Sequence, residues 1–443
     1  MGPASSVRLR VRRLGAITAL LTVGGLIATP ASIASVSVGA PRAPGRAVQA
    51  PQASRKTLAR APKALQAAVR ATLGPRSTLA GPSQQAELTP SDGTANDFGW
   101  SVDISGSTAV VGAPFCFQTS CPGAAYVFVR SGSIWTQQAK LTASDGLNGD
   151  EFGFNIAISG STVVVGVDVK NQAAGVAYVF VRSGTIWSQQ AELTASDGVA
   201  YDHFGVSVAI SGSTTVVGAF GRNSFTGAAY VFVRSGTIWS QQAELTASDG
   251  AASDEFGWSV DISGSTAVVG ALLKNNATGA AYMFVRSGTI WSQRAELTAS
   301  DGAASDSFGF RVAISGPTVL VAAPYKDSNT GTAYVFVRSG TIWSQQAELT
   351  ASDGTAGDYF GWSVAISGST AIVGAIDKGP KHAGAAYVFV NSGGIWSQLA
   401  ELTASDATAY DVFGYSVSLY RSTLVVGAPG HGSSGATYVF VNV

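Results

Sequence analysis

The chain has 443 residues, of which 46% are hydrophobic and only 12% are charged, and it contains 53 glycines. The formal net charge is zero, but all 12 charged residues of 1–82 are basic, which leaves 15 basic against 27 acidic residues in 83–443. An acidic body argues against nucleic acid as a partner, because phosphate binding needs a basic face. The many glycines, together with abundant Val, Ser and Thr, favour an all-β fold.

Residues 1–34 are predicted to be a secretory signal peptide. Four arginines precede an apolar run at 14–28, which is too short to span a membrane comfortably, and small residues at 32–34 offer a cleavage site. An uncleaved anchor is the alternative. Residues 35–82 are rich in Ala, Pro and Arg and are predicted to be a disordered linker or pro-segment. We therefore expect a secreted or cell-surface protein with no transmembrane span after cleavage.

The dipeptide Phe-Gly recurs seven times in 83–443, at steps of 52 to 54 residues. Its phenylalanines are Phe98, Phe152, Phe204, Phe256, Phe308, Phe360 and Phe413. A period near 50 residues is typical of repeat proteins in which each copy is one supersecondary unit.

The fourth copy illustrates the strands expected in each unit. Residues 256–262 alternate between bulky apolar side chains and small or polar ones, which is the two-residue period of a strand. Turns that contain Gly precede or separate three further expected strands at 266–271, 279–286 and 290–298. Seven such units predict a seven-bladed β-propeller with four antiparallel strands per blade. The alternative, an open solenoid, would need atypical capping repeats at both ends.

The last copy stops after its third strand, and a candidate for the missing strand precedes the first copy. Residues 83–89 match residues 240–246, which form the expected fourth strand of the third copy. We expect 83–89 to complete the seventh blade and close the ring, which removes open sheet edges. Residues 83–443 would then form one propeller domain.

Phe-Gly, followed by a strand and by Val-Gly-Ala-Pro at 111–114 and 426–429, resembles the FG-GAP repeat. The resemblance covers 83–443, is closest to a subgroup of exported bacterial proteins, and implies the seven-bladed propeller of integrin α-chains. Integrin-type repeats often carry a calcium loop between their first two strands. Residues 262–266 form a shorter turn with too few carboxylates for that role, so integrin-like calcium binding is not expected here.

In such a propeller, the loops between strands two and three share a face with those that lead to the next blade. The two-to-three loops differ most between copies, and loops on rigid scaffolds often carry binding functions. We predict an adhesion or binding module that uses this face for an extracellular protein or glycan; the alternative is that the loops vary because nothing constrains them. The candidate binding residues are Arg222, Asn223, Lys274, Asn275, Tyr325, Lys326, Asp327, Lys381, His382 and His431.

The same face carries paired aspartates, always five residues apart. The pairs are Asp92/Asp97, Asp145/Asp150, Asp197/Asp202, Asp249/Asp254, Asp301/Asp306, Asp353/Asp358 and Asp406/Asp411. They could bind calcium, with Asp249, Asp254, Asp301 and Asp306 as candidates. We favour the interpretation that they accept hydrogen bonds from turn N–H groups, and we predict no cofactor.

The two cysteines, Cys116 and Cys121, lie in one loop of the first copy. In an exported chain they are predicted to form a local disulfide. A metal or redox pair is the alternative, but no histidine lies near them to complete a zinc site.

The sequence contains no recognisable catalytic motif. His203, His382 and His431 fall in different copies, and neither a metalloprotease motif nor a phosphate loop is present. We therefore predict a monomeric non-enzyme. A carbohydrate-binding lectin or a polysaccharide-acting enzyme is the alternative, because aspartate pairs can hydrolyse glycosides and aromatic residues can stack on sugars. The aromatic residues that follow Phe-Gly are Trp100, Phe154, Trp258, Phe310, Trp362 and Tyr415.

Overall fold

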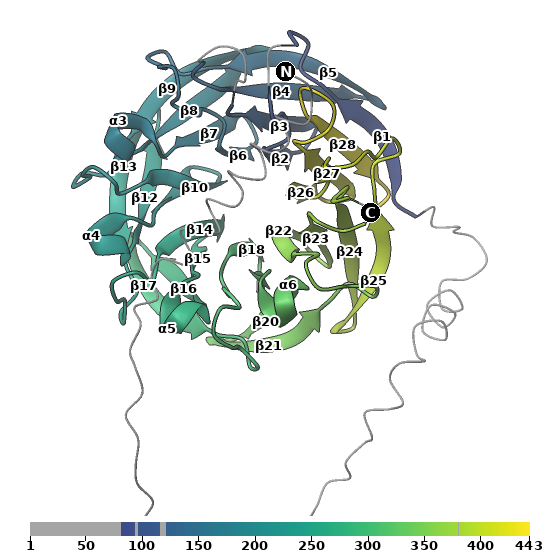
Figure 1. Cartoon of the computed structure of the whole chain (residues 1–443). Coiled ribbons are helices and arrows are strands. Elements are labelled where there is room, and N and C mark those ends of the chain that lie inside the picture. The colour runs from purple at the N-terminus through teal and green to yellow at the C-terminus, as the bar shows by residue number, and fades with distance from the viewer. Residues whose placement is uncertain (1–80, 94–95, 116–120, 380) are drawn as a thin grey trace, which may run out of the picture. The chain divides into compact units, whose positions relative to one another are not determined.

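The computed structural model describes residues 81–93, 96–115, 121–379 and 381–443. The predicted signal peptide (1–34) and nearly all of the predicted linker (35–82) lie outside the described residues. The rest forms seven four-stranded antiparallel sheets arranged in a ring (Figure 1). The prediction of an all-β, seven-bladed propeller is confirmed.

Each of the four strand positions recurs in all seven blades. The innermost strands are β2 (Ser101–Ser105), β6 (Asn155–Ser159), β10 (Phe204–Ser211), β14 (Phe256–Ser263), β18 (Arg311–Ser315), β22 (Phe360–Ser367) and β26 (Ser416–Tyr420). The second strands are β3 (Thr108–Ala113), β7 (Thr162–Val167), β11 (Thr214–Ala219), β15 (Thr266–Ala271), β19 (Thr318–Ala323), β23 (Thr370–Ala375) and β27 (Thr423–Ala428).

The third and fourth strand positions, toward the outside of the ring, are likewise occupied in every blade. The third strands are β4 (Ala124–Ser131), β8 (Val176–Ser183), β12 (Ala228–Ser235), β16 (Ala280–Ser287), β20 (Thr332–Ser339), β24 (Ala385–Ser392) and β28 (Ala436–Val441). The outermost strands are β5 (Ile134–Leu141), β9 (Ile186–Leu193), β13 (Ile238–Leu245), β17 (Ile290–Leu297), β21 (Ile342–Leu349), β25 (Ile395–Leu402) and, from the N-terminal side, β1 (Ser83–Leu88). We number the blades 1 to 7 from β2 onward.

The sequence pattern of each strand follows its depth in the blade. All six residues of β15 are buried, because both faces of this Val-rich strand are covered by neighbouring blades. In the outermost strand β17 only Leu297 is buried, and Ile290, Arg294 and Glu296 are exposed. The described core consists of seven clusters, and each cluster contains residues of two adjacent blades.

Phe256 illustrates how the Phe-Gly dipeptide packs. Its side chain is fully buried, and its ring lies 5.5 Å from that of Tyr282 and 5.9 Å from that of Phe284. The cluster also includes Leu245 of blade 3, so Phe256 fills the layer between two blades. The phenylalanine of the repeat therefore belongs to the core and joins neighbouring blades.

Two glycines allow the backbones of adjacent blades to come close around Phe256. Gly227 of blade 3 has φ +87° and pairs with Phe256 in a parallel bridge; a Cβ there would lie 1.9 Å from the Phe256 carbonyl oxygen. Gly257 has φ +94°, and its Cβ would lie 2.2 Å from the oxygen of Ala228. Any larger residue at either position would force these backbones apart.

The seventh sheet has the strand order β1-β28-β27-β26, so residues from both ends of the repeat region share one blade. Ser83 is paired with Val441 and Leu88 with Thr437 in antiparallel register. Figure 1 shows β1 on the outer edge of that blade. In this structure β1 therefore takes the place that the sequence assigned to residues 83–89.

Side-chain hydrogen bonds link the outermost strands of adjacent blades. Trp291 donates from Nε1 to Gln242 of the preceding blade at 3.0 Å, and Trp135 donates in the same way to Gln85 of β1 at 3.1 Å. β1 thus makes the contacts that an internal outer strand makes.

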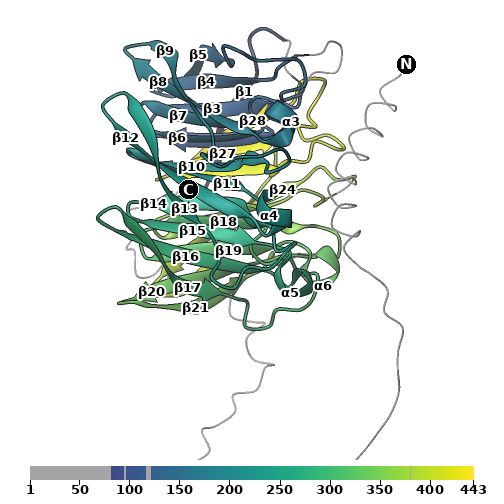
Figure 2. The same cartoon turned by 90° about the vertical axis from the view of Figure 1, so that its left-hand side faces the viewer.

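The two faces of the ring differ in their connections (Figure 2). One face carries short turns, most of which contain Gly. The other face carries the two-to-three loops and the loops that lead to the next blade, and we call it the loop face. In blades 2 to 5 these loops include four-residue helical segments, α3 (Lys170–Ala173), α4 (Arg222–Phe225), α5 (Lys274–Ala277) and α6 (Lys326–Asn329). None of the described helices is long and apolar enough to cross a membrane.

Candidate functional site

Each of the segments α3 to α6 contains a left-handed turn, which the sequence did not indicate. In α4, Asn223, Ser224 and Phe225 have φ angles of 50°, 58° and 63°. This conformation costs about 1–2 kcal/mol for a residue with a Cβ atom. The turn therefore needs partners that hold it in place.

The next blade supplies those partners. The carbonyl of Phe225 accepts a hydrogen bond from the N–H of Glu255 at 2.8 Å, and the carbonyl of Thr226 accepts one from Phe256 at 3.1 Å. Equivalent bonds join blade 4 to blade 5 (Ser307 to Ala277, 2.7 Å) and blade 5 to blade 6 (Tyr359 to Asn329, 2.8 Å). Because these bonds use the backbone alone, side chains on the turns are free to differ between blades.

Beneath each of these turns, a basic side chain lies between the two aspartates of its blade; we call this arrangement the cation seat. In blade 4, Lys274 Nζ lies 2.8 Å from Asp249 and 3.6 Å from Asp254. Tyr282 donates its hydroxyl to Asp249 at 2.9 Å. Lys274 is 5% exposed, so its charge is directed inward.

The seat recurs in blades 2 to 7 with different basic residues. The distances from the lysine Nζ to the Oδ2 atoms of the first and second aspartate of the blade are 3.1 and 2.9 Å for Lys170. They are 3.1 and 3.6 Å for Lys326, and 3.1 and 3.1 Å for Lys378. In blade 3, Arg222 pairs with Asp197 and lies 3.5 Å from Asp202. In blade 7 the basic residue is His431, at 3.5 Å from Asp406 and 3.0 Å from Asp411.

The neighbouring carboxylates favour the charged form of the lysine in the cation seat, and the lysine favours theirs. Burial lowers the pKa of Lys274, but its hydrogen bond to Asp249 and the nearby charge of Asp254 outweigh this and raise the pKa above its usual value. The hydrogen bond from Lys274 in turn is the main reason that the pKa of Asp249 is lowered. Burial raises the pKa of the neighbouring Glu296 on β17. The lysine therefore neutralises carboxylates that would otherwise repel one another.

In blade 1 the basic residue that pairs with the first aspartate comes from a different strand. Lys140 stands on β5 where other blades have a glutamate, and its Nζ lies 2.6 Å from Asp92. A basic residue recurring seven to nine positions before the third-strand tyrosine is the signal that could have predicted the seat.

The structure divides the ten candidate binding residues into three groups. Arg222, Lys274, Lys326 and His431 belong to cation seats, where their nitrogen atoms pair with carboxylates of the same blade. Tyr325 is only partly exposed and packs edge-on against Phe310 and Tyr359. The candidates that are exposed on the loop face are Asn223, Asn275, Asp327, Lys381 and His382.

The aspartate pairs serve the turns and the cation seats. Asp254 is buried and accepts a hydrogen bond from the N–H of Ala251 at 2.8 Å, and Asp306 does the same with Ala303. This is the turn role that the sequence favoured. At the calcium candidates Asp249, Asp254, Asp301 and Asp306, a lysine ammonium group lies within 3.6 Å of both carboxylates of each pair.

One of the predicted pairs is shifted by a residue. Asp97 directly precedes Phe98 and has φ 54°, as Glu151 has before Phe152 with φ 63°. The position equivalent to Asp150 is therefore Asn96. Asp92 alone keeps the predicted place in blade 1.

Cys121 is disulfide-bonded, as predicted for the loop of blade 1. Its predicted partner, Cys116, lies outside the described residues.

The three histidines lie in different blades, and each is paired with a different aspartate. His203 Nδ1 lies 3.1 Å from Asp168, and His382 Nδ1 lies 3.4 Å from Asp377. His203 also stacks on Phe220 at 4.7 Å. The structure does not bring the histidines together into one centre.

The aromatic residues after Phe-Gly pack mainly against one another around the ring axis. Trp362 lies 5.1 Å from Phe310 and 5.9 Å from Tyr415, and these three side chains are at most 9% exposed. Trp100, Phe154 and Trp258 are partly exposed. Such mutual packing leaves little ring surface for stacking on a sugar.

Large apolar side chains are exposed on the loop face over blades 2 and 3. Leu147, Val199, Tyr201 and Phe225 are exposed by 67%, 54%, 65% and 37%, respectively. We call these four residues the apolar patch. Large apolar groups that are exposed on the loops of one face are candidates for contacts with a protein partner.

On the innermost strands, Asp103 and Asp261 connect neighbouring blades. Asp261 accepts hydrogen bonds from the N–H groups of Ile262 at 2.7 Å and of Ile314 in the next blade at 2.7 Å. Burial nevertheless raises the pKa of Asp261 to about 7, and the charge of Asp103 adds to the effect. Four other blades have alanine at this position (Ala157, Ala209, Ala313 and Ala365).

This raised pKa predicts a defined pH dependence for the variant Asp261→Ala. The folded protein holds the Asp261 proton more tightly than the unfolded chain does, so its contribution to stability is present below about pH 4 and is lost as the pH rises through about 7. Relative to the wild type, Asp261→Ala should become more stable by about 2–4 kcal/mol between pH 4 and pH 8. Urea unfolding across this range measures the difference, and a difference that does not change with pH would contradict the prediction.

The FG-GAP repeat family matches the chain at residues 82–128, 135–180, 187–232, 239–284, 291–336, 343–389 and 396–440. The chain belongs to the FG-GAP repeat family. The seven matches recur with the period of the repeat, and each begins within one residue of the start of an outermost strand and ends in the third strand of the next blade. FG-GAP propellers generally act as binding modules. None of the curated proteins matches the chain.

Proposed function

We propose that this FG-GAP propeller is an exported, non-catalytic adhesion module whose loop face binds an extracellular protein. The apolar patch is the observation that carries the proposal. Tyr201 and Leu147 expose about two thirds of their side chains on the same face as the exposed polar residues Asn223 and Asn275. Protein interfaces commonly combine exposed aromatic and aliphatic side chains with polar ones.

The rigidity of the loops supports the same function. Each left-handed turn is fixed by backbone hydrogen bonds to the next blade, so exposed side chains such as Phe225 are presented with little loss of conformational freedom on binding. A glycan remains the alternative partner, but the aromatic residues proposed for sugar stacking pack mainly against each other. Export is supported by the predicted signal peptide, and the separate histidine–aspartate pairs support a non-catalytic role.

Sister blades supply the substitutions that test the proposal. The triple variant Val199→Ala, Tyr201→Ser and Phe225→Ala gives blade 3 the residues that blade 4 has at equivalent positions, Ala251, Ser253 and Ala277. These side chains are exposed, so stability should change by less than about 1 kcal/mol. Binding to cell-surface and extracellular proteins, measured by affinity capture with the full chain, should fall at least tenfold.

A control on the opposite face separates specific docking from general adhesiveness. Ile238 is 71% exposed there, and Ile238→Ser should leave capture unchanged. Equal capture by the wild type and the triple variant would contradict the proposed surface. A glycan array that retains the wild type and the triple variant alike would favour the carbohydrate alternative.

Export is checked by N-terminal sequencing, which should give Ser35 as the first residue of the secreted chain.

A further inference from the structure

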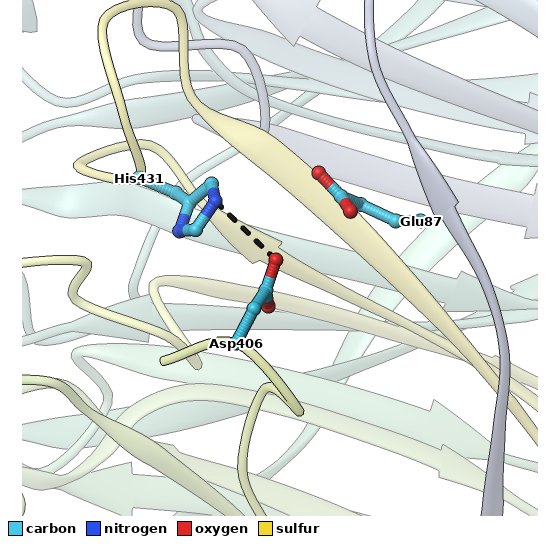
Figure 3. Close-up of side chains that lie close together, drawn as sticks. All are labelled: Glu87, Asp406 and His431. Atoms are coloured by element: carbon cyan, nitrogen blue, oxygen red, sulfur yellow. Dashed lines mark ion pairs between the residues drawn. The ribbon is translucent and has the colours of Figure 1, made fainter. Parts of the chain in front are cut away.

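We propose that blade 7 binds a divalent first-row transition metal ion, of the zinc type, through His431, Asp406 and Glu87. Figure 3 shows these three side chains directed toward a common space, from the two-to-three loop, from the loop that precedes blade 7, and from β1. One ligand atom of each lies within 4.8 Å of the other two. No other group of three such side chains meets this criterion among the described residues.

The distances already approach those of a metal centre. Zinc–nitrogen and zinc–oxygen bonds of about 2.0–2.1 Å place tetrahedral ligands about 3.4 Å apart. His431 Nε2 and Asp406 Oδ2 lie 3.5 Å apart. Glu87 is exposed, so a change of rotamer is enough to bring its carboxylate closer. The fourth position would be open to water or to a group from a binding partner.

The neighbouring Asp411 prepares His431 for this role. The Nδ1 atom of His431 lies 3.0 Å from Asp411 Oδ2, and the side chain of Asp411 is fully buried. Thr408 donates to both oxygens of Asp411 through its N–H and its hydroxyl, at 2.6 Å each. The carboxylate can therefore accept a hydrogen bond from Nδ1–H, and in that tautomer the lone pair of Nε2 is available for a metal. Histidine ligands of metals are commonly oriented by a carboxylate in this manner.

Comparison with the other blades indicates why a metal ion fits here. In blade 4 the equivalent carboxylates, Asp249, Asp254 and Glu296, surround the ammonium group of Lys274. Blade 7 retains all three carboxylates, as Asp406, Asp411 and Glu87, but its basic residue is the shorter His431. A dication bound to His431 would occupy the region that the lysine ammonium fills elsewhere. Imidazole nitrogen favours zinc, copper, iron or nickel over calcium or magnesium.

The metal ion would also join the two ends of the repeat region. Glu87 belongs to β1, whereas Asp406 and His431 come from the C-terminal part of the chain. Binding would hold β1 against blade 7 and stabilise the folded ring by mass action. Thermal stability therefore reports metal binding without any need for the proposed protein partner.

Calorimetry with Zn²⁺ on the full chain, after chelator treatment, tests the site. We expect one bound Zn²⁺ per chain and an increase in Tm of a few degrees. His431→Lys copies the residue of blades 2, 4, 5 and 6, so it should fold normally and weaken Zn²⁺ binding at least 100-fold. Glu87→Gln should weaken it at least tenfold.

Two matched variants make the result specific. Glu348→Gln alters the equivalent glutamate in blade 5, where Lys326 fills the seat, and should leave Zn²⁺ affinity unchanged. His382→Ala removes an exposed histidine elsewhere on the loop face and should also have no effect. Zn²⁺ binding that survives His431→Lys, or no binding by the folded wild type, would overturn the assignment. Heat with Ca²⁺ but none with Zn²⁺ would overturn it as well.

Discussion

A chain that begins at Pro90 is expected to lose cooperative unfolding and to aggregate, whereas a chain that begins at Gly81 should unfold like the full-length protein. The truncation removes β1, which supplies the outermost strand of blade 7 and pairs with β28 from Ser83 to Leu88. Without it, the edge of β28 has unpaired N–H and C=O groups that can pair with another chain.

The loss would extend beyond one strand. Gln84 accepts a hydrogen bond from the N–H of Ser405, and Gln85 accepts one from Trp135 of blade 1, so β1 connects blade 7 to both of its neighbours. Leu88 is 3% exposed and packs in the cluster that includes Phe98 and Tyr126. Size-exclusion chromatography and calorimetric melting compare the two chains. A monodisperse product from Pro90 that melts in a single sharp transition would contradict this account.

The second large effect is expected for Phe256→Ala, which should lower the free energy of unfolding by about 3–5 kcal/mol. The ring is fully buried between blades 3 and 4 and is in contact with Tyr282 and Phe284, so its removal leaves a cavity in close-packed surroundings. Repeat proteins can unfold in more than one step, so the loss should be greatest in the transition that includes these two blades.

A matched control for this cavity is available on the surface. Ile238 is 71% exposed, and Ile238→Ala should change stability by less than about 0.5 kcal/mol. Urea unfolding followed by tryptophan fluorescence measures both variants. Equal stability of Phe256→Ala and the wild type would show that the layer between blades does not depend on this ring.

The strands could be predicted almost to the residue because local and long-range signals agree. Expected strands at 256–262, 266–271, 279–286 and 290–298 correspond to Phe256–Ser263, Thr266–Ala271, Ala280–Ser287 and Ile290–Leu297 in the structure. Gly-containing turns delimit each strand, and two-residue periodicity identifies its faces. Repetition adds seven examples of the same pattern, which fixes the architecture.

The loop face was less predictable, for a physical reason that Lys274 illustrates. A lysine in a variable loop usually reaches into solvent, so its charge suggested surface binding. The structure turns Lys274 inward, where Asp249 and Asp254 compensate its charge, and this orientation depends on a left-handed turn in non-glycine residues. Such a turn has no reliable sequence signature, because it is held by hydrogen bonds from the next blade.

The apolar patch was missed because its members come from different loops. Leu147 and Val199 lie in two successive blade-to-blade loops, and Phe225 lies in a two-to-three loop. In the sequence each is an isolated apolar residue among polar ones. Only the ring arrangement places them on one exposed surface.

Hydrogen–deuterium exchange on the full-length chain tests most directly the claim that β1 completes a ring of seven equivalent blades. The paired amides of Ser83–Leu88 should exchange as slowly as those of the equivalent outermost strands β5 (Ile134–Leu141) and β13 (Ile238–Leu245), because all of them are held by one neighbouring strand. Complete exchange of the β1 amides within seconds, while β5 and β13 stay protected, would contradict the closed ring.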